Sequence, residues 1–305
     1  MAPGSALGWR RTTVTSNDEQ LLAALDRQLA HIRTFVRGVA EGYNKGGFYL
    51  WGRGGTSKSF TVTKTLLDLN KKFIPTNSRL TAKGLFTLLR EHPSDVHVLE
   101  DVETLFADPH SVGVLRSALG DRVVCWTTAQ LDDHFEFEGG IIMVSNCDLH
   151  QLPQLLALKT RLSCFHYQPT NEQLGALMRK LARDGEVEGA GRLGPEKSLE
   201  VVDAILQRCT RLRKPLDLRL LVHALADRIQ DEDGAAEVGW QELLDVRMHE
   251  RVVSTSCGLR QQKNNNEREI ARQIVNLPPQ ERLTVWEQAT GKSLSSLYRC
   301  LRQAT

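Results

Sequence analysis

The sequence has few cysteines for its length, and no two of them lie close together. The six, which include Cys125, Cys147 and Cys164, are scattered at wide intervals, and no C-x-x-C pair occurs. This spacing excludes a zinc-ribbon site and the dense disulfide framework of small secreted domains. We therefore expect reduced thiols, most of them buried.

Long apolar runs are missing as well. No segment approaches the roughly 18 apolar residues that a membrane span needs, and residues 1–5 open no basic and then hydrophobic leader. Hydrophobic residues make up 41% of the chain and charged residues 25%, as in soluble globular proteins. The sequence predicts a cytoplasmic protein without a membrane partner.

The chain has almost no net charge, +2 in total, but its charges are unevenly placed. Residues 251–305 carry nine Lys and Arg against four Asp and Glu, which leaves the rest of the chain slightly acidic. If nucleic acid is a partner, the basic C-terminal part is the place where phosphate contacts are expected.

Hydrophobic periodicity predicts an α/β core. A capping-box spacing at 16–19 is followed by apolar residues at helical period, which predicts a helix ending near Gly42. Short apolar runs then alternate with helical stretches. Strands are expected at 48–51, 96–99, 122–126, 141–144 and 162–167, with helices at 58–69, 81–90 and 115–119 between them. This alternation predicts a mostly parallel sheet covered on both faces.

The later part of the chain reads as helical. A glycine-rich segment, 184–195, predicts a linker to helices at about 196–230 and 239–251, and a polar break at 254–266 precedes three short helices, 267–275, 279–289 and 293–303. We expect five parts: an N-terminal helical segment (1–45), the α/β core (46–183), a helical block (184–253), a linker (254–266) and a small all-α module (267–305).

A glycine-rich segment stands between the first predicted strand and the next helix. There, glycines allow backbone N–H groups to converge on phosphate oxygens, and the helix N-terminus adds partial positive charge. In such a phosphate loop Lys58 reaches the β- and γ-phosphates and Ser59 can ligate magnesium. The predicted nucleotide-binding residues are Gly52, Gly54, Gly55, Thr56, Ser57, Lys58, Ser59 and Phe60.

One position departs from the phosphate-loop pattern. Ser57 stands where a glycine is expected before the lysine. If the site requires a left-handed backbone, serine costs on the order of 1–2 kcal/mol there. A glycine-rich turn without a ligand is the alternative interpretation of this segment.

Two carboxylates follow the predicted strand at 96–99. Glu100 and Asp101 are expected at the carboxyl edge of the sheet, where open α/β sheets bind ligands. We assign Glu100 to the magnesium ion and Asp101 to polarising the attacking water. His97 is expected to be an ordinary core histidine.

These motifs resemble those of the AAA+ ATPases over about residues 18–250. The resemblance implies that Asn146, after the strand at 141–144, is the sensor 1 residue that orients the attacking water. It implies that Arg161 is an arginine finger for a neighbouring subunit, and that Arg219 is the sensor 2 residue of a helical lid, the block at 184–253. It further implies ATP and Mg²⁺ as cofactors and self-association into a ring or filament.

The tail resembles a Fis-type helix-turn-helix module. A Thr290-Gly291 turn separates two short helices, and Leu294, Leu297 and Leu301 form an apolar stripe on the second. The resemblance places this helix in the DNA major groove, with Lys292, Ser295, Arg299 and Arg302 as contact residues. A small bundle that only packs on the ATPase or dimerises is the alternative.

The sequence as a whole predicts an oligomeric AAA+ ATPase that acts on DNA in replication initiation, helicase loading or transposition, with a helicase, transposase or polymerase as a protein client. A superfamily III viral helicase is a competing resemblance, because the interval between Asp101 and Asn146 is short and holds a strand. A nucleotide-dependent scaffold or transcription regulator with little hydrolysis is another, although the GAFTGA loop of polymerase-remodelling activators is absent.

Overall fold

The computed structural model describes residues 16–77, 80–127, 132–149, 155–249, 270, 274, 278–290 and 297–298. The chain divides into two compact units, residues 1–251 and 252–305. None of the helices in the described ranges is both long and apolar enough to cross a membrane.

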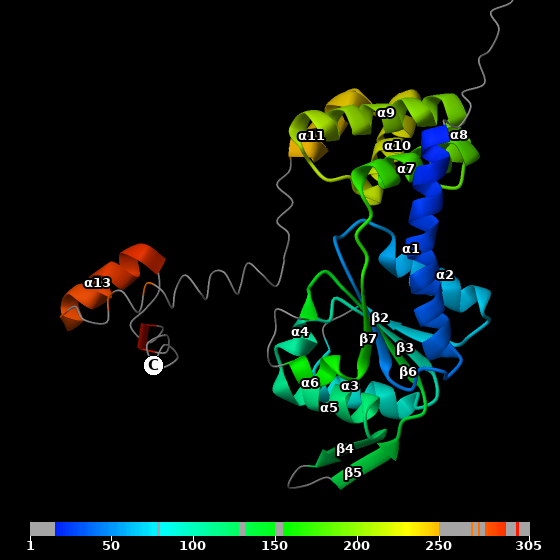
Figure 1. The fold of residues 1–305 in the computed structure, drawn as a ribbon. Helices are drawn as coiled ribbons and strands as arrows, with labels where there is room; N and C mark the ends of the chain where they lie inside the picture. The colour runs from blue at the N-terminus through cyan, green and yellow to red at the C-terminus, as the bar shows by residue number, and fades with distance from the viewer. Residues whose placement is uncertain are drawn as a thin grey trace, which may run out of the picture. The chain divides into compact units, whose positions relative to one another are not determined.

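A five-stranded parallel sheet lies at the centre of the first unit (Figure 1). Its strand order is β2-β3-β6-β1-β7, and every neighbouring pair is parallel. Burial on both faces explains why the central strands read as continuous apolar runs. The strands are β1 (Gly47–Trp51), β2 (Phe73–Thr76), β3 (Val96–Glu100), β6 (Gly140–Ser145) and β7 (Leu162–His166). This confirms the predicted α/β class.

Helices cover both faces of the sheet. On one face, α1 (Ser16–Ala40) and α2 (Lys58–Asp68) pack their apolar residues onto β1, β3 and β6, forming a core that includes Ile32, Val36, Phe48 and Leu66. The other helices gather on the opposite side of the sheet in Figure 1: α3 (Ala82–Glu91), α4 (Glu103–Phe106), α5 (Pro109–Leu119) and α6 (Leu156–Lys159).

The helices that follow β7 form a second layer with its own core, which we call the lid. Its members are α7 (Asn171–Asp184), α8 (Ala190–Leu193), α9 (Pro195–Leu212), α10 (Leu218–Glu232) and α11 (Trp240–His249). Leu174 and Met178 of α7 belong to the buried lid cluster, so the helical layer starts with α7 rather than at the predicted residue 184. The segment 184–195, predicted as a linker, is also part of the lid, because Ala190 of α8 is buried in the same cluster.

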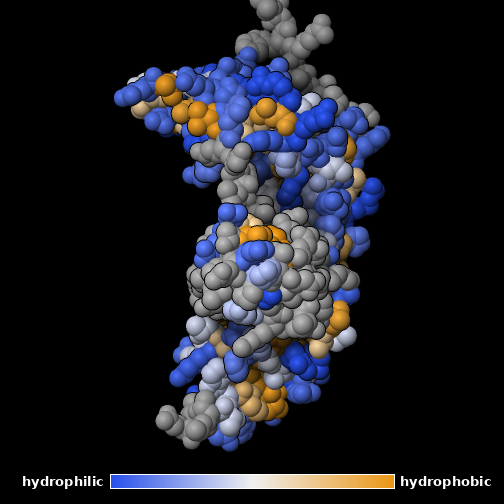
Figure 2. Space-filling model, turned by 90° about the vertical axis from the view of Figure 1, so that its left-hand side faces the viewer, coloured by the Kyte–Doolittle hydropathy of each residue, from blue (hydrophilic) through white to orange (hydrophobic). Residues whose placement is uncertain are grey.

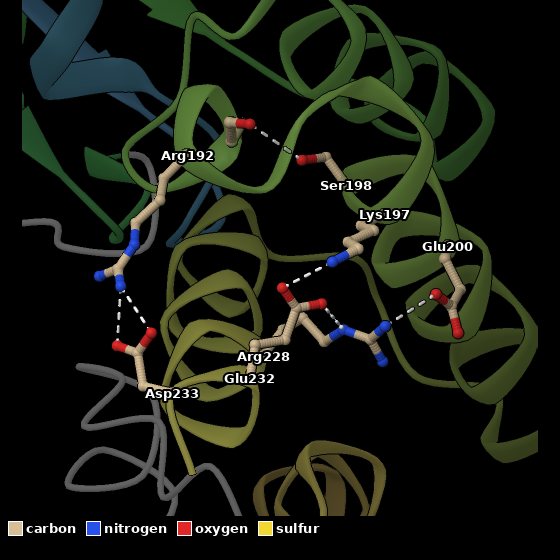
Figure 3. A network of polar contacts seen from close by, with 8 residues as sticks. Arg192, Lys197, Ser198, Glu200, Arg228, Glu232 and Asp233 are labelled. Atoms are coloured by element: carbon tan, nitrogen blue, oxygen red, sulfur yellow. Dashed lines mark hydrogen bonds and ion pairs between the residues drawn. The ribbon is translucent and has the colours of Figure 1, made fainter. Parts of the chain in front are cut away.

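The outer surface of the lid is polar. Arg192 pairs with Asp233, Lys197 with Glu232, and Arg228 with Glu200 and Glu232, so that ion pairs link α8, α9 and α10 (Figure 3). Exposed pairs of this kind contribute little to stability, because water and salt screen them. On the face shown in Figure 2, hydrophilic residues cover most of the lid and apolar residues gather only in small patches. The stability of the lid therefore rests mainly on its apolar core.

Helix α1 connects the sheet to the lid. Its second half packs on β1 and β6, with Phe35 stacked on Phe48 and Val39 against Gly140, while near its start Asp18 accepts two hydrogen bonds from the guanidinium of Arg179 on α7, at 3.0 and 2.6 Å. Asp18 is only 6% exposed, so this is a bidentate pair shielded from water on the carboxylate side. One helix thus fixes the lid to the core.

The strand predicted at 122–126 exists, but its assignment to the parallel sheet was wrong. Strand β4 (Val123–Thr127) pairs antiparallel with β5 (Asp132–Glu136) in a separate hairpin. Trp126 and Phe135 turn inward and contact the Phe86 ring of α3, with ring centroids 5.7 and 5.4 Å away. These aromatic contacts hold the hairpin against α3 instead of in the sheet.

Strand β2 at the edge of the sheet was not predicted. It has only four residues, one of them Pro75, which provides no N–H for a sheet hydrogen bond. It pairs in parallel with β3, with Pro75 opposite Val98, and so forms one edge of the sheet.

The second unit contains α13 (Pro279–Thr290), which confirms the helix predicted at 279–289. Trp286 is fully buried and packs in a small cluster with Ile274 and Leu297. The inward orientation expected for Leu297 is therefore confirmed. The remaining members of the predicted stripe and the four predicted DNA contacts lie outside the described residues: Leu294, Leu301, Lys292, Ser295, Arg299 and Arg302.

Candidate functional site

A cavity of about 600 Å³ opens between the carboxyl edge of the sheet and the lid. The loop after β1, the ends of β3 and β6, and the first turns of α10 all contribute to its wall. Most of the predicted site residues of the first unit line it: Gly54, Gly55, Thr56, Ser57, Lys58, Ser59, Phe60, Glu100, Asp101, Asn146 and Arg219. Residues far apart in the sequence therefore meet at one place, as the parallel topology predicts.

The backbone of the glycine-rich loop requires its small residues. Gly52 has a φ of 154°, and a Cβ at this position would collide with the carbonyl oxygen of Tyr167. Ser57 has φ 70° and ψ 16°, the left-handed conformation. The predicted strain at Ser57 is thus present in the structure. The loop leads directly into α2, whose N-terminal N–H groups form an anion-binding end.

Lys58 is buried at the base of the cavity. Its Nζ donates hydrogen bonds to the carbonyl oxygens of Gly52 and Arg53, at 2.8 and 2.6 Å, and to Oδ1 of Asn146 at 3.2 Å. Burial, reinforced by the positive charge of Arg219, lowers the pKa of Lys58 to about 8. The ammonium group is thus held by neutral oxygens, in a place where an anion would stabilise it better.

Two carboxylates stand opposite the lysine. Glu100 is the last residue of β3, and Asp101 follows it with a φ of 51° and an exposed side chain. In the described ranges no three His, Cys, Asp or Glu side chains form a metal cage. Magnesium, however, commonly binds through one or two protein oxygens plus substrate phosphates. Ser59 and Glu100 offer such oxygens, so the residues fit this ion.

A third acid, Glu103, was missed by the sequence analysis. Its Oε1 accepts a hydrogen bond from the Ser145 hydroxyl at 2.6 Å and another from the backbone N–H of Asn146 at 3.3 Å. Glu103 is the first residue of α4, and its two contacts fix the end of β6. The only sequence indication is its place in the acidic run Leu99-Glu100-Asp101-Val102-Glu103.

Arg219 lies on the lid side of the cavity, in the first turn of α10. Its side chain is exposed, and its backbone N–H donates to Oδ1 of Asp217, the N-cap of the helix, at 2.8 Å. Its charge acts on Lys58 across the cavity. Two cations therefore line the same space, an arrangement that suits a polyanionic ligand.

Arg161 does not line the cavity. It precedes β7 at the amino end of the parallel strands, next to Gly47, whereas Lys58 follows their carboxyl end, about 16 Å further along at 3.3 Å per residue. Its Nη1 donates to the carbonyl oxygen of Ala157 at 2.8 Å, and its side chain crosses Gly120. Arg161 is therefore remote from the loop of its own chain.

His97, which the sequence analysis set aside, lies in the core. His97 is fully buried, its Nε2 is 2.8 Å from the carbonyl oxygen of His92, and burial lowers its pKa. The four described cysteines are free thiols: Cys147 and Cys209 are buried, Cys164 is half-buried and Cys125 is exposed. For these four the expectation of free thiols is confirmed, but only two of them are buried, whereas most were expected to be.

No protein-family model and no curated protein matches the sequence. Among solved structures, NtrX from Brucella abortus in complex with ADP is similar at a TM-score of 0.50 and 15% identity, covering 92% of this chain and 68% of that one. Aeropyrum pernix ORC1 in complex with DNA gives 0.46 at 11% identity, covering 91% and 82%. The Thermotoga maritima Holliday junction branch migration motor RuvB gives 0.39 at 14% identity, covering 94% and 87%. The chain therefore shares the α/β fold of the NtrX structure, with a five-stranded parallel sheet flanked by helices.

Proposed function

We propose that the chain binds ATP with magnesium in the cavity between sheet and lid, and hydrolyses it. The observation that carries this proposal is the convergence of Lys58, Glu100, Asp101, Asn146 and Arg219 on one cavity beside a glycine-rich loop and a helix N-terminus. A cavity of about 600 Å³ is large enough for a nucleotide. The similar NtrX structure holds ADP, which agrees with this ligand class.

The proposed roles follow from position. N–H groups of the loop and of α2 bind the phosphates, and Lys58 exchanges its carbonyl partners for phosphate oxygens. Ser59 and Glu100 hold magnesium, which when bound with ATP would neutralise charge on the phosphates. Asp101 and Asn146 orient the attacking water, and Arg219 stabilises the γ-phosphate from the lid.

We extend the proposal to assembly and DNA. Arg161 is remote from its own cavity, so it can serve as an arginine finger only in the site of a neighbouring subunit, in a ring or filament. DNA binding is assigned to residues 267–305, because basic residues are in excess in the C-terminal part and the sequence there resembles a helix-turn-helix. A replication, helicase-loading or transposition role with a protein client fits this frame.

The direct test compares nucleotide binding with phosphate release. Lys58→Ala should lose ATP binding, whereas Asp101→Asn should bind ATP and release phosphate at least 10²-fold more slowly, roughly the loss expected when a positioned base is removed. Lys64→Ala is the matched control, since Lys64 lies on the same helix but pairs with Asp68 on the surface. Unchanged ATP affinity in Lys58→Ala would refute the site. Normal binding without phosphate release in the unchanged chain would instead favour a nucleotide-dependent scaffold.

The β4–β5 hairpin favours a second candidate, a superfamily III-like helicase, because that family uses a hairpin at this place to track single-stranded DNA. The described outward positions of β5, however, are Asp132, His134 and Glu136, and no Lys or Arg lies between 123 and 136. An acidic surface repels phosphates. We therefore place this candidate second.

A further inference from the structure

The glycine-rich loop is attached to the lid through a side chain that does not line the cavity. Arg53 donates a hydrogen bond from Nη2 to the carbonyl oxygen of Leu216 at 2.9 Å. Leu216 lies just before α10, and its own N–H donates to Oδ1 of Asn171 on α7 at 3.1 Å. The Arg53 guanidinium thus reaches the segment that connects the lid helices α9 and α10.

Two further contacts join the same segments. The N–H of Leu218 donates to the carbonyl oxygen of Gly55 at 2.9 Å. The Asp217 carboxylate lies against Gly55, whose φ of 69° and close neighbour leave no room for a Cβ. Three consecutive lid residues, 216–218, therefore contact loop residues 53 and 55.

This attachment fixes the start of α10, and with it Arg219. Asp217 caps the helix by accepting from the backbone N–H of Arg219, so the residue that contacts Gly55 also orients the first turn. The backbone of Arg53 also contacts Lys58, because the Arg53 carbonyl oxygen accepts a hydrogen bond from Lys58 Nζ at 2.6 Å. The two cations that face the cavity are thus connected through one loop residue.

We infer that Arg53 is a positioning residue that sets Arg219 against the terminal phosphate, so that the site distinguishes nucleoside triphosphates from diphosphates. This inference rests on the proposed ATP site. A contact to the γ-phosphate stabilises bound ATP but not bound ADP, so displacement of Arg219 reduces the preference for ATP without removing binding to the loop. Arg53 acts through the lid and does not contact the nucleotide.

The test measures ATP and ADP dissociation constants for the full chain with Arg53→Ala, Arg219→Ala and the double variant. Each single change should reduce the ratio of ADP to ATP dissociation constants by roughly 5- to 20-fold, within the range of such couplings. In the double variant this ratio should fall no further than in Arg219→Ala alone, because both changes remove the same contact, that of Arg219 with the γ-phosphate. Arg53→Lys should restore much of the preference, since one donor suffices for the Leu216 carbonyl. Arg192→Ala, which breaks an exposed lid ion pair, is the control and should leave the ratio unchanged.

Amide hydrogen exchange provides a second measurement that needs no nucleotide. In Arg53→Ala the Leu218 amide should exchange faster, whereas amides in the middle of α10 should keep their protection. An unchanged ratio, or additive losses in the double variant, would overturn the inference while leaving the ATP site in place. Failure of the unchanged chain to bind ATP would overturn the proposed function itself, and the inference with it.

Discussion

The Nζ atom of Lys58 lies 3.2 Å from Oδ1 of Asn146. This hydrogen bond joins the start of α2 to the tip of β6, two residues separated by 88 positions in the sequence. Glu103 holds the backbone of the same tip. Lys58, Asn146 and an acid from α4 therefore form one connected group, and a ligand that moves Lys58 also changes the environment of Asn146.

The lowered pKa of Lys58 predicts a pH dependence of ATP binding. Phosphate binds the ammonium form, and that form is lost from the free protein as the pH rises through about 8. ATP affinity should therefore fall between pH 8 and 10, by up to about tenfold per pH unit. Isothermal calorimetry across this range measures it. Lys58→Arg, which stays charged, should give a flat profile, and an equally flat profile in the unchanged chain would contradict the assignment.

The lowered pKa of Lys58 has the opposite effect on stability: it weakens ATP binding as the pH rises but strengthens the folded state. Between pH 8 and about 10.5 the unfolded chain keeps a proton on Lys58 that the folded chain has lost, so this residue makes the free energy of unfolding rise with pH across that window. Loss of ATP affinity there cannot then be attributed to unfolding caused by Lys58.

Replacing Ser57 with glycine should stabilise the protein. Relief of the left-handed strain should add about 1–2 kcal/mol to the free energy of unfolding, whereas the greater conformational freedom of glycine in the unfolded chain should subtract about 0.5–1 kcal/mol. We expect a net gain of about 0.5–1 kcal/mol in the free energy of unfolding, measured by urea denaturation. Ser57→Ala keeps the strain and is the matched control. A destabilised Ser57→Gly variant would show that the hydroxyl itself has a structural or binding role.

Arg161 should act across a subunit interface. Its removal should lower ATP turnover by roughly 10³-fold, as in other systems that use an arginine finger. Mixing Arg161→Ala with Lys58→Ala should restore part of the activity, because one chain supplies an intact cavity and the other an intact finger. No recovery at any ratio, with mixed assembly verified by size measurement, would make Arg161 a structural arginine bound to Ala157.

The tail should bind duplex DNA in a salt-dependent manner. Arg302→Ala should weaken binding to all sequences and lower the slope of log affinity against log salt by about one. Arg299→Ala, if that side chain reads a guanine edge, should cost roughly 1–3 kcal/mol chiefly on the preferred site. Anisotropy titrations of a chain ending at Asn266 provide the comparison. Equal DNA affinity with and without the tail would move DNA contact to the first unit and favour the helicase candidate.

Elements whose burial leaves a continuous or periodic apolar pattern could be predicted from the sequence. Strand β6 is buried throughout, so its sequence admits few other interpretations. Strand β5 was missed because its outward positions are polar, and its inward Phe135 depends on contact with α3. The segment 184–195 was predicted as a linker because Gly185, Gly189 and Gly194 resemble a flexible stretch, whereas all three have positive φ and cap the ends of α7, α8 and α9.

In the candidate site, too, residues with a local sequence pattern were predicted and residues placed by tertiary contacts were not. Lys58 and Glu100 were found because a loop pattern and a strand end fix them locally. Glu103 and Arg53 contribute through contacts with Asn146 and Leu216, and such contacts depend on how a short helix and the lid pack. No local pattern in the sequence encodes those distances.

Strand β2 ends the sheet with four residues and a proline. An open sheet edge otherwise offers a template on which another chain can add a strand, and this is a common start of aggregation. The missing N–H of Pro75 and the short length of β2 make this edge a poor template. Chains brought close together, as a ring or a filament would require, therefore have little tendency to join edge to edge through β2.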